Sequence, residues 1–239
     1  MSHFRIQELY LTQGDSLTLD NLYRVRYVLN AGGVCLLPSD TCYAVAGAPL
    51  VQNVSDRVRV LRGGNEPLPV SVDSLTMLDR WGQLSCPERR VVDTHCPGPI
   101  TMVCEARAHV AHFVSDRLGT CGTFGFRIPD SIVERDIVSF LDVPVTTCAL
   151  RDLSGQVCKN FDDAIDLFRG RLSEFEDPPL ALAIKRHSFA YSDVSTVISV
   201  KSKAHEPPQV QVIREGAIDT KALQKSISDF VFSEFEDWT

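Results

Sequence analysis

The chain has 239 residues, of which 44% are hydrophobic and 23% are charged, and its formal net charge is −7. This hydrophobic content excludes a disordered chain, and the lack of an apolar run of about 18 residues predicts that no helix spans a membrane. The negative net charge gives no overall attraction to nucleic acid, so binding of RNA would need a local basic surface.

Eight cysteines are spread along the chain, and none of them forms a C-x-x-C pair. This spacing argues against a zinc ribbon or a thioredoxin-type redox site. Several cysteines lie in apolar segments, where a reduced cysteine packs as a small hydrophobic residue. The N-terminal residues lack the charged and then apolar pattern of a secretory signal. We therefore expect a reducing compartment and place the protein in the cytoplasm.

The hydrophobic spacing alternates between the period of strands and that of helices. In chain order it predicts a strand at 4–11, a helix at 15–30, a strand at 34–37, a helix at 51–61, a strand at 68–72, short helices at 74–81 and 87–94, strands at 100–104 and 123–128, a helix at 131–141, a strand at 143–148, a helix at 161–175, strands at 180–184, 195–200 and 209–213, and a closing helix at 219–235. Residues 105–120 are ambiguous. No linker or repeat divides the chain, so one domain is expected over residues 1–239. The alternation favours an α/β fold with a mixed or parallel sheet.

Apolar residues at helical spacing predict the face that each helix buries. Val60 lies off the apolar stripe of its helix, although it is apolar. Thr18 is one of three candidate N-caps for the first helix, together with Asp15 and Ser16. The expected inward residues are Leu19, Leu22, Val25 and Leu29 in helix 15–30, Val51, Val54, Val58 and Leu61 in helix 51–61, Ile132, Ile137 and Leu141 in helix 131–141, and Phe161, Ile165, Phe168 and Leu172 in helix 161–175.

A polar elbow follows the apolar strand at 34–37. Pro38 ends the strand because it lacks a backbone N–H, and Ser39, Asp40 and Thr41 come directly after it. These short side chains are typical of a capped turn, which is the more ordinary interpretation. The alternative is a ligand site, since open α/β sheets bind ligands outside the ends of their strands.

Other polar residues also fall near predicted strand ends. The chain has no G-x-x-x-x-G-K-[ST] loop, no G-x-G-x-x-G fingerprint and no G-x-S-x-G elbow. Arginine forks suit phosphate or carboxylate oxygens, although a solvated ion pair is the commoner fate of an arginine. His109 and His112 have no nearby third ligand, so no metal site is expected. The candidates that would share a cleft are Ser39, Thr41, Arg62, Thr101, Arg127, Thr146, Thr147, Ser195, Thr196 and Arg214.

Six short motifs, in this order, resemble the YrdC/YciO family of threonylcarbamoyl-AMP synthases and their relatives. The resemblance covers about residues 15–217, which would form the core of the domain. The motifs are Pro38-Ser39-Asp40-Thr41-Cys42-Tyr43, Arg62-Gly63-Gly64-Asn65-Glu66-Pro67-Leu68, Pro97-Gly98-Pro99-Ile100-Thr101, Gly125-Phe126-Arg127-Ile128-Pro129, Ser195-Thr196-Val197-Ile198 and Ile213-Arg214-Glu215-Gly216-Ala217.

The resemblance implies a twisted α/β sheet around a concave basic cleft that binds ATP with Mg²⁺. It implies synthesis of threonylcarbamoyl-AMP from L-threonine, bicarbonate and ATP, for the threonylcarbamoyladenosine modification of tRNA, with RNA or tRNA-modification proteins as partners. Matched motif by motif, it assigns Arg62 and Arg127 to catalysis, Ser39, Thr41, Tyr43 and Thr101 to substrate binding, and Thr147, Cys148, Ser195, Thr196 and Arg214 to the nucleotide.

Two departures from the family pattern fall on the implied ATP cleft. The family lysine that stands two residues before its arginine is replaced by Val60, and the family's Ser-Ala-Asn becomes Cys148-Ala149-Leu150 with two residues inserted after it. Three hypotheses therefore remain. The protein is a threonylcarbamoyl-AMP synthase, a nucleotide- or RNA-binding module that has lost the chemistry, or a carbamoyl-transfer relative with another acceptor.

Overall fold

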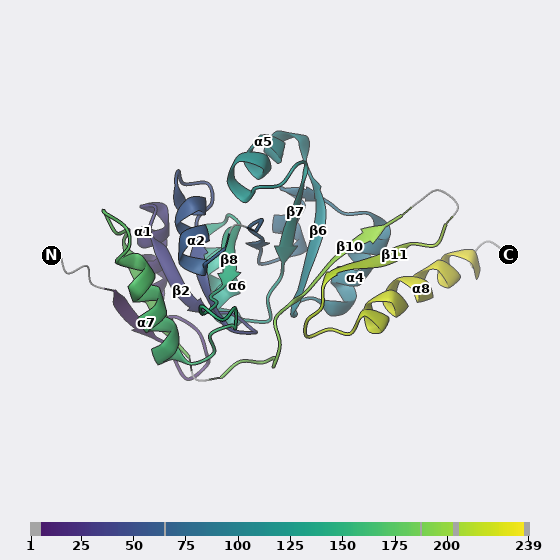
Figure 1. Ribbon diagram of the computed structural model, residues 1–239. Helices are drawn as coiled ribbons and strands as arrows, with labels where there is room; N and C mark the ends of the chain where they lie inside the picture. The colour runs from purple at the N-terminus through teal and green to yellow at the C-terminus, as the bar shows by residue number, and fades with distance from the viewer. Residues whose placement is uncertain (1–5, 65, 187, 203–205, 237–239) are drawn as a thin grey trace.

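The computed structural model describes residues 6–64, 66–186, 188–202 and 206–236. In this part of the chain, one mixed sheet of 11 strands runs through the molecule (Figure 1). The strands follow one another in the order β1-β9-β2-β3-β8-β4-β7-β6-β10-β11, with β5 paired to β6. Their bounds are β1 Gln7–Tyr10, β2 Val34–Pro38, β3 Tyr43–Gly47, β4 Val70–Ser71, β5 Gly82–Gln83, β6 Ile100–Ala106, β7 Thr123–Arg127, β8 Val145–Ala149, β9 Ala181–Lys185, β10 Thr196–Lys201 and β11 Gln209–Arg214. The predicted α/β class with a mixed sheet is confirmed.

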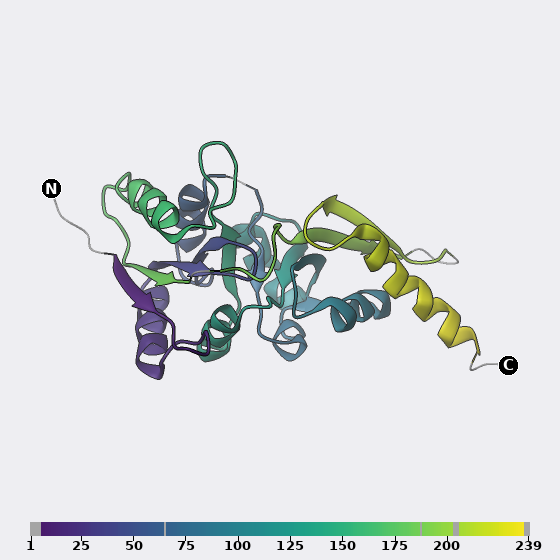
Figure 2. The same ribbon diagram turned by 90° about the horizontal axis from the view of Figure 1, so that it is seen from below.

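Several helices lie towards the two ends of this sheet, whereas α5 and α6 lie near its middle (Figure 1). Helices α1, α2 and α7 lie around β2, whereas α4 and α8 lie beside β10 and β11 at the opposite end (Figures 1 and 2). The bounds are α1 Leu19–Asn30, α2 Val54–Arg62, α3 Leu75–Leu78, α4 Cys86–His95, α5 Ala111–Phe113, α6 Ile132–Leu141, α7 Phe161–Leu172 and α8 Thr220–Glu236. None of the helices in the described ranges is both long enough and apolar enough to cross a membrane.

The polar elbow is the loop of a tight hairpin. Residues 43–47 form β3, which pairs antiparallel with β2 so that Pro38 lies opposite Tyr43. The sequence pattern predicted the strand before this loop but no strand after it. The structure also assigns the stretch 105–120, which was ambiguous in the sequence. Strand β6 continues to Ala106, and short helical turns follow from Ala108 to Leu118.

Two predicted helix faces were partly wrong. Leu19 and Ile132 are 61% and 45% exposed, and each is the first residue of its helix. In α6 the buried positions include Glu134, which lies beside the buried Val133 and Ile137. The predicted N-cap Thr18 accepts a hydrogen bond from the Asn21 backbone, and all four predicted inward residues of α7 are buried. The helical spacing of apolar residues thus predicted where the helices lie better than it predicted which of their residues are buried.

Gly47 lets α2 approach β3 closely. A Cβ atom at this position would lie 2.4 Å from Val54 Cγ1 and 2.9 Å from Val58 Cγ2. Gly47→Ala is therefore expected to lower the free energy of unfolding by about 1–3 kcal/mol, measured by urea titration. The control is Gly170→Ala in α7, where an added Cβ has no atom within 4 Å. That variant should stabilise the helix by about 0.5–1 kcal/mol, and equal effects at the two sites would contradict the packing argument.

Candidate functional site

A cavity of about 500 Å³ opens over the middle of the sheet. Its walls come from β3, β8, β7, β6, β10 and β11, which are consecutive in the sheet apart from β4. The hairpin loop after β2 and the C-terminal end of α2 complete the rim. Nine residues expected at the site line this cavity: Ser39, Thr41, Arg62, Thr101, Arg127, Thr147, Cys148, Ser195 and Arg214.

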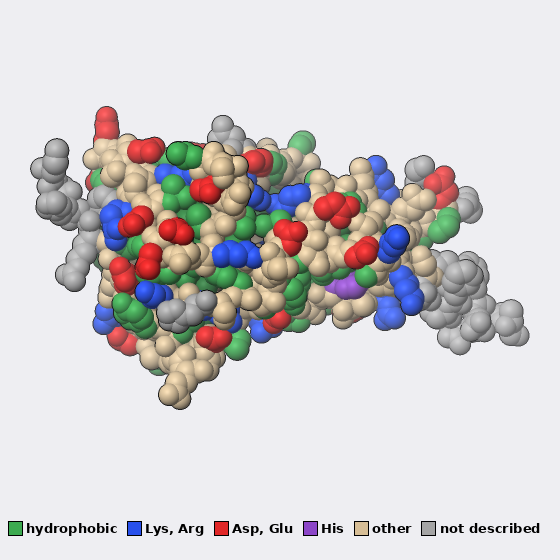
Figure 3. All heavy atoms as spheres, turned by 60° about the horizontal axis from the view of Figure 1, so that its bottom comes forward, with side chains coloured by type: hydrophobic (Ala, Val, Ile, Leu, Met, Phe, Trp, Pro, Cys, Tyr) green, Lys and Arg blue, Asp and Glu red, His purple; other side chains and the backbone are tan. Residues whose placement is uncertain are grey.

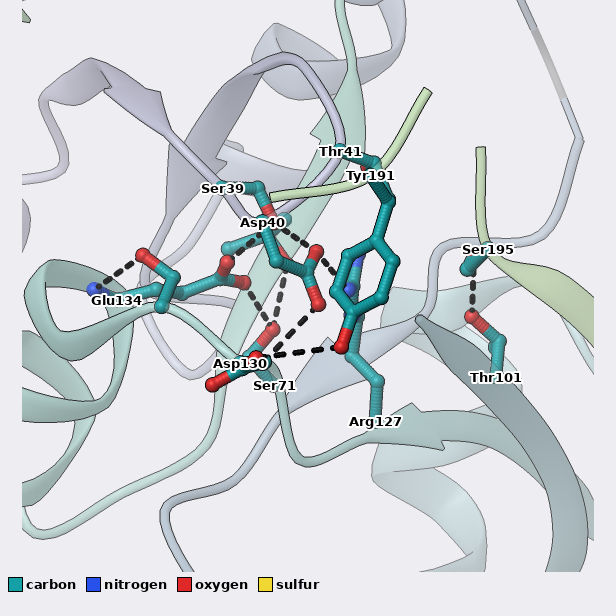
Figure 4. A network of polar contacts seen from close by, with 12 residues as sticks. Ser39, Asp40, Thr41, Ser71, Thr101, Arg127, Asp130, Glu134, Tyr191 and Ser195 are labelled. Carbon is teal, nitrogen blue, oxygen red and sulfur yellow. Dashed lines mark hydrogen bonds and ion pairs between the residues drawn. The ribbon is translucent and has the colours of Figure 1, made fainter. Parts of the chain in front are cut away.

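The floor of the cavity holds a buried ion pair between Asp40 and Arg127 (Figure 4). The Asp40 carboxylate also accepts the backbone N–H of Asp130 at 3.0 Å, and its own side chain is fully buried. Burial alone would lower the pKa of Arg127, but the charges of Asp40 and Glu134 outweigh burial and raise that pKa above its usual value. Arg127 is thus held as a cation in a place that water hardly reaches.

Tyr191 covers one side of this pair. Its hydroxyl donates to the Asp130 carboxylate at 3.2 Å, and its backbone N–H donates to the Asp40 carbonyl at 3.2 Å (Figure 4). The segment before β10 is therefore tied to the hairpin loop after β2.

A second buried carboxylate, Glu134, lies beneath the cavity wall. It accepts hydrogen bonds from Ser39 Oγ and Ser71 Oγ, each at 2.5 Å. Ser71 Oγ also lies 2.6 Å from Thr147 Oγ1. The sequence singled out neither Glu134 nor Ser71. A signal was present for Glu134, since it stands one turn before Ile137 on the face that α6 buries.

Besides Arg127, three arginines line the cavity: Arg62, Arg151 and Arg214. Arg62 pairs with the largely exposed Glu66 at 2.5 Å, whereas Arg151 and Arg214 have no carboxylate partner among the described residues. Arg214 donates to the Ser195 carbonyl at 2.6 Å, and Arg151 donates to the Gly155 carbonyl at 2.6 Å. Burial lowers the pKa of Arg214, and the positive charges of Arg151, Arg127 and Arg62 lower it further. Three arginines line one cavity, and two of them have no carboxylate partner in the described part of the chain, an arrangement that favours the binding of an anion.

Arg151 also lines the cavity, and the sequence pattern did not predict this. It stands two residues beyond β8, in the polar turn where the family pattern is interrupted. Its position supplies a positive charge to a cleft that lacks the family lysine.

The cavity cysteines are poor nucleophiles. Burial raises the pKa of Cys42 to about 11 and also raises the pKa of Cys148. Both remain protonated thiols near neutral pH, and a thiol is far less reactive than a thiolate. Hydroxyls and arginines are therefore the groups that face a ligand.

Three residues expected in the cleft or at the substrate, namely Tyr43, Thr146 and Thr196, and the two departures Val60 and Leu150 lie away from the cavity lining. Thr146 Oγ1 donates to the Pro69 carbonyl at 2.9 Å. The Tyr43 ring is buried against Phe161 and Phe189, and its hydroxyl donates to the Arg186 carbonyl at 2.7 Å. Thr196 Oγ1 donates to the Ile218 carbonyl at 2.8 Å. Tyr43 and Thr196 brace the walls from behind. Val60 is 47% exposed on α2, and Leu150, where the family has asparagine, is fully buried.

Comparison with known proteins gives a consistent picture. The Sua5_yciO_yrdC family model, described as "Telomere recombination", matches residues 27–216. The chain is 24% identical over 200 residues to a Methanocaldococcus jannaschii protein named "Putative threonylcarbamoyl-AMP synthase", covering 83% of the chain and 86% of that protein. It is 28% identical over 142 residues to the Homo sapiens threonylcarbamoyl-AMP synthase, covering 59% of the chain and 50% of that protein.

Solved structures share the fold at low sequence identity. The crystal structure of P. abyssi Sua5 complexed with L-threonine superposes with a TM-score of 0.74 at 17% identity, covering 93% of the chain. The chain spans 61% of that structure. The crystal structure of E. coli YciO gives a TM-score of 0.70 at 18% identity, covering 92% of the chain and 99% of YciO.

Proposed function

The chain belongs to the Sua5/YciO/YrdC family, and from this premise we propose that it binds ATP and L-threonine and makes threonylcarbamoyl-AMP. One observation carries the proposal: Arg62, Arg151 and Arg214 converge on a single cavity, and two of them lack a carboxylate partner in the described ranges. A cavity of about 500 Å³ is within the usual size range for small-molecule sites. Such a site favours an elongated polyanion such as a nucleoside triphosphate.

The proposed reaction needs no covalent protein intermediate. The amine of L-threonine combines with bicarbonate to give a carbamate and water. A carbamate oxygen then attacks the α-phosphorus of ATP, and pyrophosphate leaves. In this scheme the cavity holds the two reactants together, and Arg62, Arg151 and Arg214 neutralise the negative charge that develops on the phosphates.

Magnesium would enter with the nucleotide as part of the substrate. No group of three or more His, Cys, Asp or Glu side chains in the described part of the chain could hold a metal ion by itself. Mg²⁺ commonly binds through substrate phosphates and keeps several waters. The donors of this cavity are mainly cationic or hydroxylic, which fits a MgATP complex rather than a metal cage in the protein.

The setting of the reaction follows from the chain's surface and its cysteines. All eight cysteines are free, which supports our placing the reaction in the reducing cytoplasm. Acidic and basic side chains are interspersed on the face shown in Figure 3, whereas direct RNA binding would need a clustered basic surface there. Product transfer to tRNA would then depend on partner proteins.

A second function has support from two positions. Val60 replaces the family lysine, and the buried Leu150 replaces the family asparagine. Both changes remove polar groups from the implied ATP site. They favour a nucleotide- or RNA-binding module that keeps the cleft and has lost the adenylation step.

Pyrophosphate release separates these functions. The purified protein is expected to release pyrophosphate from MgATP only when both bicarbonate and L-threonine are present, because the carbamate is the attacking group. Binding of ATP without threonine-dependent release would favour the binding module. Absence of both binding and release would overturn both proposals while leaving the family assignment in place.

A further inference from the structure

We propose that Glu134 is a positioning residue that fixes the direction of the hydrogen bonds along one wall of the cavity, so that this wall receives the primary amine or ammonium group of the ligand. The inference deepens the proposed function and rests on it for the choice of probe. The first observation that supports the inference is the burial of Glu134. This residue is 0% exposed beneath the wall that Ser39 and Thr147 form.

The Ser39 branch has only one possible direction. A carboxylate accepts hydrogen bonds and donates none, so Ser39 must donate to Glu134 Oε2 across their 2.5 Å contact. The other polar side-chain neighbour of Ser39 is Asp40 Oδ1 at 3.1 Å, which is also a carboxylate oxygen. Both neighbours accept, and the shorter contact is the one to Glu134, so Ser39 uses its single hydrogen within the protein. Its lone pairs are therefore what it can offer to the cavity.

The Thr147 branch is fixed in the same way through Ser71. Ser71 donates its only hydrogen to Glu134 Oε1 at 2.5 Å. Because Ser71 can then only accept, Thr147 must be the donor in the 2.6 Å contact between the two hydroxyls. Thr147 lines the cavity, so it too faces the ligand with lone pairs (Figure 4 shows Glu134, Ser71 and Ser39 in this arrangement).

The cavity lining consequently includes groups of opposite hydrogen-bonding character. Arg62, Arg151 and Arg214 can only donate, whereas Ser39 and Thr147 are fixed as acceptors. A ligand that satisfies both kinds of group carries anionic oxygens as well as an N–H group. A ligand with an oxygen acceptor in place of the amine would set lone pair against lone pair in a nearly buried place, which is costly.

The test compares L-threonine with its 2-oxo analogue, 3-hydroxy-2-oxobutanoate, in which a carbonyl oxygen that can only accept replaces the amine. Affinities are measured by titration calorimetry with ATP present and bicarbonate excluded, so that no reaction occurs. The wild-type protein is expected to prefer L-threonine by about 10- to 100-fold. Glu134→Gln keeps the shape but introduces an amide donor. When that donor faces Ser71, Ser71 can donate to Thr147 and the Thr147 hydrogen turns towards the ligand. The preference should fall about tenfold or more.

The matched control is Glu88→Gln. Glu88 also accepts from a serine, at 2.8 Å from Ser85 Oγ, but it lies in the capping box of α4 and outside the cavity lining. This variant should keep the wild-type preference. If Glu134→Gln does not fold, Ser71→Ala releases the Thr147 hydrogen with a smaller change and should also reduce the preference.

Three results would overturn the inference: an unchanged preference in the Glu134 and Ser71 variants, an equal weakening of both probes, or a wild-type protein that binds neither probe. The proposed function is tested by a separate measurement, the release of pyrophosphate. A preference that depends on Glu134, without any release of pyrophosphate, would support the amine wall and reject the synthase activity.

Discussion

Asp40→Ala is expected to lower the free energy of unfolding by about 3–5 kcal/mol, which is the cost of breaking a buried ion pair from one side. The variant leaves the Arg127 guanidinium without its counter-charge, in a place where the arginine side chain is only 8% exposed. It also removes the acceptor of the Asp130 backbone N–H. Urea unfolding followed by circular dichroism measures the loss.

An exposed pair provides the control for this prediction. Asp166 and Arg169 form an ion pair on α7 at 2.7 Å, with both side chains at least half exposed. Asp166→Ala should change stability by less than about 1 kcal/mol, because water screens such pairs. Similar losses for the two variants would show that burial does not govern the Asp40–Arg127 pair. Arg127→Leu with Asp40→Leu should recover part of the stability, because no charge then remains buried without a partner.

The second large effect is expected on activity. Arg62→Ala should lower the rate of threonine-dependent pyrophosphate release by about 10²–10³-fold, the usual effect of removing one group that stabilises developing charge. Arg62 ends α2 and projects into the cavity, with its Nη1 atom 3.7 Å from Cys148 Sγ. Its partner Glu66 is 68% exposed in its side chain, so this pair is weak and leaves Arg62 able to face an anion.

The matched control for Arg62 is Arg169→Ala. Arg169 also lies in the last turn of a helix and pairs with an acid on the same helix, but it is outside the cavity lining. Its removal should leave the rate within about twofold of wild type, as is usual for exposed ion pairs. Steady-state kinetics should show the loss for Arg62→Ala in kcat rather than only in KM. A rate for Arg62→Ala equal to that of the control would remove Arg62 from the mechanism.

Arg151 offers a positive charge that Val60, at the position of the family lysine, does not provide. In the proposed ATP site a cation would lie near the phosphates, and the exposed Val60 cannot supply one. Arg151 reaches the same cavity from the turn after β8, and its charge helps to lower the pKa of Arg214. The geometry therefore offers a replacement for the missing lysine from another part of the chain.

The sequence by itself determined the α/β class, most of the elements and the family resemblance. The four apolar residues before Pro38 predicted β2, and the spacing of Phe161, Ile165, Phe168 and Leu172 predicted the buried face of α7. These features depend on local period and on turn chemistry, which a sequence displays directly. Nine of the residues that the motifs and strand ends indicated line one cavity, whereas their roles stay predictions.

Only the tertiary structure decided which polar groups meet. Strand pairing brings Ser39, Ser71 and Thr147 to one buried carboxylate, although the chain separates Ser39 from Glu134 by 95 positions. The same packing turned Tyr43 and Thr196 behind the walls and brought Arg151 to the cavity. Helical and strand periods specify which face of an element is buried, but they carry no information about the partner across that face. Hydrogen-bond direction, and with it the character of the cavity wall, exists only once those partners are in contact.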